Sequence, residues 1–153
     1  LQDPRYTRGP FNARYGRIVS AAPLRPATRD SNQPFRELSR TCLDAFHATH
    51  DFFALHLITA SHAFRICAPW AGPDPHALFS VGLAAAFLAI GAPTFVPIED
   101  SVPTRPIEGL SRASDEHDIK LAYSCGAQTR AFGDSAYEWV AASYLAARLS
   151  PPR

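Results

Sequence analysis

The stretch PFRELSRTCLDAFHATHDFFALHLITASHAFRICAP, residues 34–69, decides the fold. No proline or glycine interrupts it between Arg36 and Ala68, and apolar or small residues recur at alternating steps of three and four. This spacing places them on one face of an α-helix, and additional phenylalanines and leucines widen the face beyond half of the circumference. The stretch is therefore predicted to form one long buried helix or two abutting ones, ended by Pro69.

Further helices are expected on the C-terminal side of this stretch. Asp74 and Pro75 are typical of a helix start, and this second helix is predicted to end at Gly91-Ala92-Pro93. After a proline-rich connection over residues 93–113, we expect Ser114 to cap a third helix and Asp134 to begin a fourth. The sequence thus predicts an all-α fold with about four main helices in bundle-like packing.

The N-terminal segment differs from the rest of the chain. Five prolines fall within residues 1–35, and six arginines fall within the first thirty residues. Prolines at this density break helices, so residues 1–35 are predicted to form an extended lead-in, with a short strand or a turn of helix over 15–22. Residues 36–150 are assigned to one helical domain. Because the chain opens on Leu1 and has no methionine, we expect a segment of a longer protein.

Composition excludes several classes of partner. Lysine and arginine number 15 against 14 acidic residues, a net charge of +1 that gives no pull toward nucleic acid. The longest apolar run, residues 77–92, is shorter than the roughly 20 residues that cross a bilayer. Three cysteines without a CxxC pair argue against a zinc ribbon or a disulfide framework. We therefore expect a cytoplasmic protein that binds neither nucleic acid nor membrane.

Two histidines of the long stretch are candidate metal ligands. His56 and His62 are six residues apart, which on a helix separates them by about 120° around the axis and about 9 Å along it. One metal ion would reach both only if the helix broke between them. HExxH, paired ExxH, GxSxG, GxGxxG and Walker motifs are absent. Their absence argues against a zincin, a ferritin-like di-iron centre, a nucleophile elbow and a nicotinamide, flavin or nucleotide site encoded in this segment. Hydrogen-bonded core histidines are the alternative reading.

The motif DEHDIK, residues 115–120, carries a second pair of candidates. The positive end of a helix dipole favours the neutral, metal-ligating form of His117, and the neighbouring carboxylates can accept its ring hydrogen bond. Lys120 is expected on the apolar side of the helix, where desolvation would lower its pKa and make it a nucleophile, a base or a carbamate-forming amine. The alternative is an ordinary surface lysine. His117 and Lys120 are thus the candidate catalytic residues.

Taken together, the motifs LHxxTxxHAxR (residues 55–65) and DEHxxK (residues 115–120) resemble the C-terminal part of the questin oxidase-like family. The segments GRIVSA and PFRELSRTCLDAF also fit what precedes these motifs in that family. The resemblance implies an oxygenase that acts on polyketide-derived aromatic compounds, with ring-opening of anthraquinones as the type reaction. Members are considerably longer, so it also implies that an N-terminal half is missing here.

The same resemblance implies a cofactor and its ligands. Family members are associated with a non-haem Fe(II) centre of histidines and a carboxylated lysine, and have been described as NADPH-dependent. By motif match the metal ligands are His62, His117 and Lys120, with His56 as a weaker candidate, and the partners are a small aromatic substrate and dioxygen. A catalytically inactive helical module for binding or assembly, or a di-metal or haem-binding bundle, are the alternative hypotheses.

Overall fold

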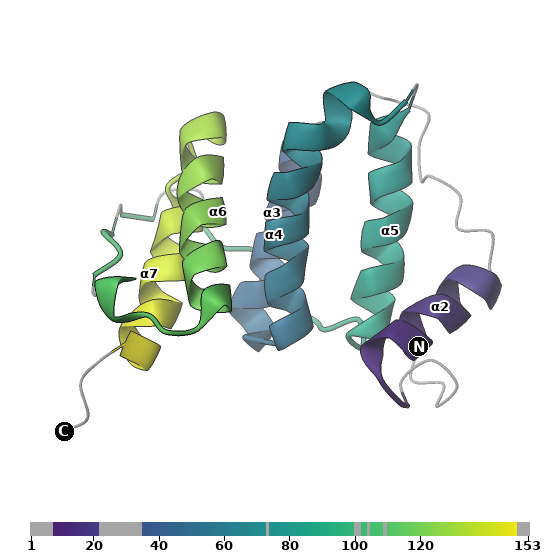
Figure 1. The fold of residues 1–153 in the computed structure, drawn as a ribbon, viewed down its shortest axis with the longest axis horizontal. Helices are drawn as coiled ribbons and strands as arrows, with labels where there is room; N and C mark the ends of the chain where they lie inside the picture. The colour runs from purple at the N-terminus through teal and green to yellow at the C-terminus, as the bar shows by residue number, and fades with distance from the viewer. Residues whose placement is uncertain are drawn as a thin grey trace. The chain divides into compact units, whose positions relative to one another are not determined.

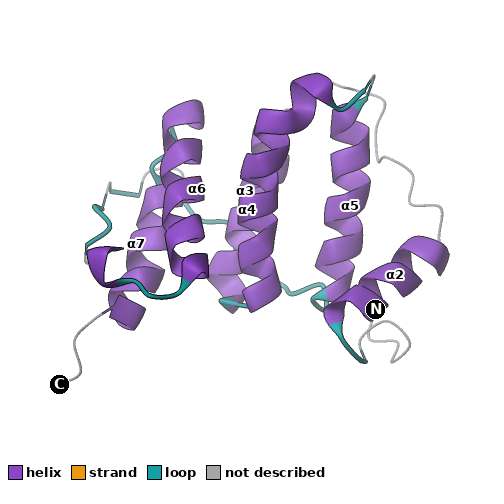
Figure 2. Cartoon of the chain, viewed as in Figure 1, coloured by secondary structure: helices purple, strands orange, loops and turns teal. Residues whose placement is uncertain are grey.

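The described residues of the chain are helical apart from turns and loops, as Figure 2 shows, which confirms the all-α prediction. They belong to a computed structural model and comprise residues 8–21, 35–72, 74–99, 102–103, 105–108 and 110–149. Six α-helices run through them, more than the four main helices expected, because one lies in the proline-rich lead-in and the long stretch divides into two.

The stretch over residues 34–69 forms two helices, α3 (Phe35–Thr49) and α4 (Phe52–Cys67), so the prediction of two abutting helices is the correct one. The break lies at His50, whose φ of 48° leaves the right-handed helical region. Asp51 then caps α4 by accepting hydrogen bonds from the backbone N–H groups of Phe53 and Ala54. Across the pair, the buried hydroxyls of Ser39 and Ser61 lie 3.1 Å apart.

The next helix, α5 (Pro75–Ala89), begins and ends where the sequence predicts. Asp74 accepts a hydrogen bond of 3.0 Å from the backbone N–H of Ala77, and Gly91 adopts a φ of 98° just after the helix. A short 3-10 turn, η1 (Ala68–Trp70), connects α4 to α5. The helices α3, α4 and α5 then enclose a core whose buried members are Cys42, Leu57, Leu83 and Ala86.

A further helix, α2 (Phe11–Ala21), corrects the extended lead-in predicted for residues 1–35. It packs on α5, and Figure 1 shows the two in contact. Ile18 on α2 is buried against Ala85 and Ala89, and the Phe11 ring stacks on the Phe53 ring at 4.3 Å between centroids. Burial of this apolar face stabilises a helix that local proline content argued against. Residues 1–7 and 22–34 lie outside the described part.

The C-terminal helices α6 (Glu116–Phe132) and α7 (Ala136–Leu149) form a tight helical hairpin. Gly133 joins them with a φ of 64°, a left-handed conformation that glycine adopts without steric cost. Asp134 lies two residues before α7 and accepts a 3.0 Å hydrogen bond from the backbone N–H of Ala136, the first residue of the helix. A 3-10 turn, η2 (Leu110–Arg112), lies in the connection that precedes α6.

The chain divides into two compact units, Leu1–Phe95 and Val96–Arg153. The first holds α2 to α5 and the second holds α6 and α7. The boundary falls inside the segment 36–150 that the sequence assigns to one domain, because the irregular connection after α5 separates the two sets of contacts. Within the described ranges, every helix is too short or too polar to cross a membrane.

Candidate functional site

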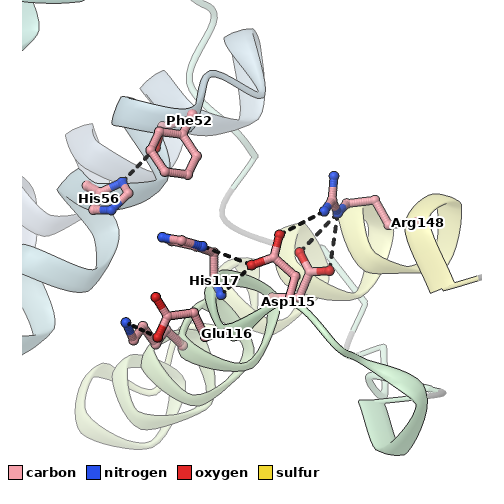
Figure 3. Close-up of polar contacts among 8 residues, drawn as sticks. Phe52, His56, Asp115, Glu116, His117 and Arg148 are labelled. Atoms are coloured by element: carbon pink, nitrogen blue, oxygen red, sulfur yellow. Dashed lines mark hydrogen bonds and ion pairs between the residues drawn. The ribbon is translucent and has the colours of Figure 1, made fainter. Parts of the chain in front are cut away.

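The N-terminus of α6 positions His117 through a single carboxylate. Asp115, rather than the predicted Ser114, is the N-cap, and its Oδ1 accepts a 2.9 Å hydrogen bond from the backbone N–H of His117. The same Oδ1 lies 2.9 Å from Nδ1 of the His117 ring (Figure 3). An ionised carboxylate only accepts, so Nδ1 donates its proton and Nε2 is the nitrogen with a lone pair for a metal ion or a proton. This is the carboxylate–histidine arrangement that orients metal-ligating imidazoles.

Arg148, near the end of α7, holds this carboxylate from the other side. Its Nη2 lies 3.3 Å from Oδ2 of Asp115, and its Nε lies 3.0 Å and 3.2 Å from the two carboxylate oxygens of Asp118. Asp118 is buried, and the guanidinium also lies over the Tyr144 ring at 5.5 Å. The hydrogen bond to Asp118 raises the pKa of Arg148. Through its contacts with Asp115 and Asp118, the positive charge of Arg148 links the start of α6 to the end of α7.

The charge of Asp115 is stabilised by the groups that it binds. Hydrogen bonds from the backbone N–H and then from the ring of His117 lower the pKa of Asp115, and the nearby Arg148 acts in the same direction. Asp115 therefore remains an ionised acceptor at neutral pH, as the orientation of His117 requires.

The lowered pKa of Asp115 predicts an acid-dependent loss of stability. Because the folded-state pKa lies below the unfolded value of about 3.9, Asp115 stabilises the hairpin above about pH 4, and this contribution is lost as pH falls through the folded-state pKa. We expect ¹³C NMR titration of the side-chain carboxyl to place the Asp115 midpoint below that of an ordinary aspartate. His117→Ala removes the ring hydrogen bond and should raise the midpoint, whereas an unchanged midpoint would contradict the Asp115–His117 contact.

Lys120 does not occupy the desolvated position that the sequence predicts. Its Nζ donates a 2.9 Å hydrogen bond to Oε2 of Glu116, and its side chain is 56% exposed. The expectation that Lys120 lies on the apolar side is therefore wrong, because the four-residue step from Glu116 places both side chains on the exposed face of α6. Lys120 lowers the pKa of Glu116, so this is a surface ion pair between two charged groups.

The two histidines of α4 have separate surroundings. Nδ1 of the exposed His56 lies 2.8 Å from the backbone carbonyl of Phe52, one turn earlier, so Nδ1 donates and Nε2 is the potential ligand (Figure 3). His62 is partly buried, and this burial, followed by the charge of Arg65, lowers its pKa and favours the neutral ring. The helix α4 is continuous between His56 and His62. The two rings are therefore separated around and along the helix axis as expected, and one metal ion does not reach both.

The structure brings His117 together with Asp115 and Arg148, and Lys120 together with Glu116. Among the described residues, no three His, Cys, Asp or Glu side chains gather in a group that could hold a metal ion. The helix α4 belongs to the first unit and α6 to the second, so a common metal site for His56, His62, His117 and Lys120 stays a prediction.

Comparison with models of known protein families, with curated proteins and with solved structures finds no match for this chain. The resemblance to the questin oxidase-like family therefore rests on the two sequence motifs and remains a prediction. The geometry around His117 stands independently of it.

Arg148 is the residue of this cluster that sequence reasoning missed. It lies 30 residues beyond Asp118, in the last turn of α7, where the sequence YLAARL (residues 144–149) is mostly small and aliphatic and does not indicate a site residue. The role of Asp115 could have been predicted from the sequence. An aspartate two residues before a histidine at a helix start can both cap the helix and accept a hydrogen bond from the histidine ring.

Proposed function

We propose that the chain is part of an oxygenase of questin oxidase type that acts on polyketide-derived aromatic compounds such as anthraquinones, with His117 as a ligand of non-haem Fe(II). The observation that supports this proposal is the 2.9 Å contact between Nδ1 of His117 and Asp115, which sets the ring for ligation through Nε2. The motifs that resemble the family supply the reaction class, with dioxygen as co-substrate and NADPH as the implied reductant.

The candidate ligands differ in how well they fit an iron ion. His117 and His56 each direct Nδ1 at an oxygen acceptor, and the lowered pKa of His62 favours the neutral form that binds metals. Lys120 does not fit the role of a carboxylated ligand, because carbamate formation needs a neutral amine and the lysine forms an exposed ion pair with Glu116. When bound by imidazoles, Fe(II) supplies open positions at which dioxygen and a substrate meet.

Besides the candidate ligands, this chain contributes residues that position the His117 ring. Asp115 and Arg148 hold the His117 ring in one tautomer and one orientation, and Arg148 also neutralises the buried charge of Asp118. Loss of partners of this kind commonly lowers metal affinity by about 10- to 100-fold. The proposal therefore assigns Asp115 and Arg148 as positioning residues.

The second candidate function is a catalytically inactive helical module for binding or assembly. The ion pair between Lys120 and Glu116 favours it, because this pair gives Lys120 an ordinary structural role at the surface. In that case the Asp115–His117 contact is a helix cap with an added ring hydrogen bond.

Iron binding by the complete protein distinguishes the two functions. We expect the protein, loaded anaerobically with Fe(II) and desalted, to retain iron, and His117→Ala to reduce the retained iron to background. Asp115→Ala should weaken the affinity by about 10-fold or more, through loss of ring orientation. Lys120→Arg preserves the positive charge beside Glu116 but cannot form a carbamate, so it should retain iron like the unmodified protein.

Three outcomes would count against parts of this proposal. Full iron content in His117→Ala would remove His117 from the ligand set, and a complete protein that holds no iron would support the binding or assembly module. Loss of iron in Lys120→Arg would restore the carbamate role that the exposed ion pair argues against. Circular dichroism of each variant shows whether the helices are retained.

A further inference from the structure

The C-terminus of α3 brings together two histidines that the proposed iron ligands do not include. His47 lies in the last turn of the helix and His50 follows its end, and their ring centroids are 6.3 Å apart at an interplanar angle of 68°. Both residues belong to the first unit. Their arrangement therefore depends on α3 and the turn into α4, and not on the placement of the second unit.

The turn that carries His50 is held by several hydrogen bonds. The backbone N–H of His50 donates to the carbonyl of Phe46 at 2.7 Å, and the Thr49 hydroxyl donates to the carbonyl of Ala45 at 2.8 Å. The backbone N–H of Asp51 donates in turn to the Thr49 hydroxyl at 3.2 Å. His50 thus sits in the left-handed region, with φ of 48°, which histidine adopts more readily than most residues with a side chain, and its ring lies 5.8 Å from the Phe46 ring between centroids.

The electrostatics of this helix end favour a bound cation. The carbonyl end of α3 carries the negative pole of the helix dipole, and the buried carboxylate of Asp44, which also accepts a 3.4 Å hydrogen bond from Nε of Arg40, lies one turn before His47. Burial lowers the pKa of His47, and the charge of His50 lowers it further, while Asp44 opposes both. The neutral ring that results at physiological pH is the form that binds metals.

The separation of the rings is close to what a shared metal ion needs. A zinc–nitrogen bond of about 2.0–2.1 Å places each ring centre about 3.2 Å from the metal, so tetrahedral coordination puts the two ring centres about 5 Å apart. The observed 6.3 Å is about 1 Å wider. Binding of a shared ion therefore requires the exposed ring of His50 to shift by about 1 Å from its position beside the Phe46 ring.

We propose that His47 and His50 form a binding site for a divalent cation of the zinc class, with two protein ligands and water in the remaining positions. Among the described residues no third His, Cys, Asp or Glu side chain joins the pair as a ligand. A cation bound by two imidazoles keeps open positions, so we expect it to exchange readily, unlike a structural zinc ion with four protein ligands. The carboxylate of Asp44 acts on it through space, as an anion near the first ring. The site is independent of the proposed iron centre.

Titration of the chain with zinc chloride, followed through the imidazole ¹⁵N resonances, tests the proposal. We expect the resonances of His47 and His50 to shift together with one dissociation constant. His50→Gly removes one ligand while it supplies the residue that a left-handed φ favours, so the fold is retained and zinc affinity at His47 should fall by about 10-fold or more. His76→Gln, which alters a histidine elsewhere in the same unit, should leave the response of His47 unchanged.

Two results would overturn the site. Equal zinc affinity at His47 in the unmodified chain and in His50→Gly would show that the two rings do not share an ion. Shifts of His47 and His50 that proceed with different dissociation constants would show independent, adventitious binding to separate imidazoles. The resonances of His56, His62 and His117 are followed in the same titration, so failure here is distinguishable from failure of the iron proposal.

Discussion

Phe46→Ala is expected to destabilise the first unit by about 3–5 kcal/mol, the usual cost of deleting a fully buried phenylalanine ring. Phe46 is completely shielded from solvent on α3, together with its neighbours Cys42, Leu43 and Ala45. Because Phe46 lies within α3 and is fully buried, the surrounding packed side chains can only partly fill the cavity that loss of the ring would leave. Urea unfolding followed by far-UV circular dichroism measures the change in free energy.

Phe52→Ala is the matched control for this substitution. It removes the same ring from the next helix, at a position that is 51% exposed, so the loss should stay near about 0.5 kcal/mol. If the two alanine variants unfold at the same urea concentration, the buried face assigned to α3 is wrong.

Arg148→Met is expected to destabilise the α6–α7 hairpin by about 2 kcal/mol, because the buried carboxylate of Asp118 loses its charged hydrogen-bond partner. This loss of stability is smaller than for a fully buried ion pair, because the Arg148 side chain is 43% exposed. The fluorescence of Trp139 on α7, recorded in a Trp70→Phe background, reports urea unfolding of this hairpin separately from the first unit.

The comparison with Lys120→Met separates a buried contact from an exposed one. Both changes remove a cation that binds a carboxylate on α6, but Lys120 and Glu116 are both largely exposed, so its loss should have no measurable effect. The double variant Arg148→Met with Asp118→Asn should recover part of the lost stability, because the uncompensated buried charge is then absent. A double variant less stable than Arg148→Met would contradict this cause.

Periodicity and caps made most of the helices predictable from the sequence. The helix α5 follows directly from Asp74 and Pro75 at its start and Gly91 after its end, and the apolar repeat determined α3 and α4. The break at His50 had no proline or glycine to mark it, and depends on Asp51 as a cap. An aspartate at this position is compatible with a helix cap, but many aspartates also lie inside helices, so Asp51 alone did not predict the break.

The missed helix α2 shows the limit of reading prolines by density. Pro10 precedes the helix, where a missing N–H costs nothing, and the next proline follows its end. Gly16 lies inside it and costs about 1 kcal/mol relative to alanine. Contact of Ile18 with α5 offsets this cost, and no local pattern reveals a contact between segments so far apart in the chain.

The candidate site divides in the same way into local and distant parts. The contact between Asp115 and His117 spans two residues, so the motif itself carries the information. The exposure of Lys120 depends on which face of α6 meets α7, and the position of Arg148 depends on the return path of the chain after Gly133. Those two features therefore required the folded hairpin.

The packing of α2 on α5 has a consequence for the order in which the protein is made. Translation delivers α2 before α5, so the surface of Ile18 remains uncovered while the whole of α3 and α4 is synthesised. The first unit therefore closes through a long-range contact that forms late and slowly, whereas α6 and α7 meet across a short turn soon after they leave the ribosome. During that interval the apolar side chains of α2 lack the contact with α5 that stabilises the helix, so this segment of the nascent chain is open to aggregation.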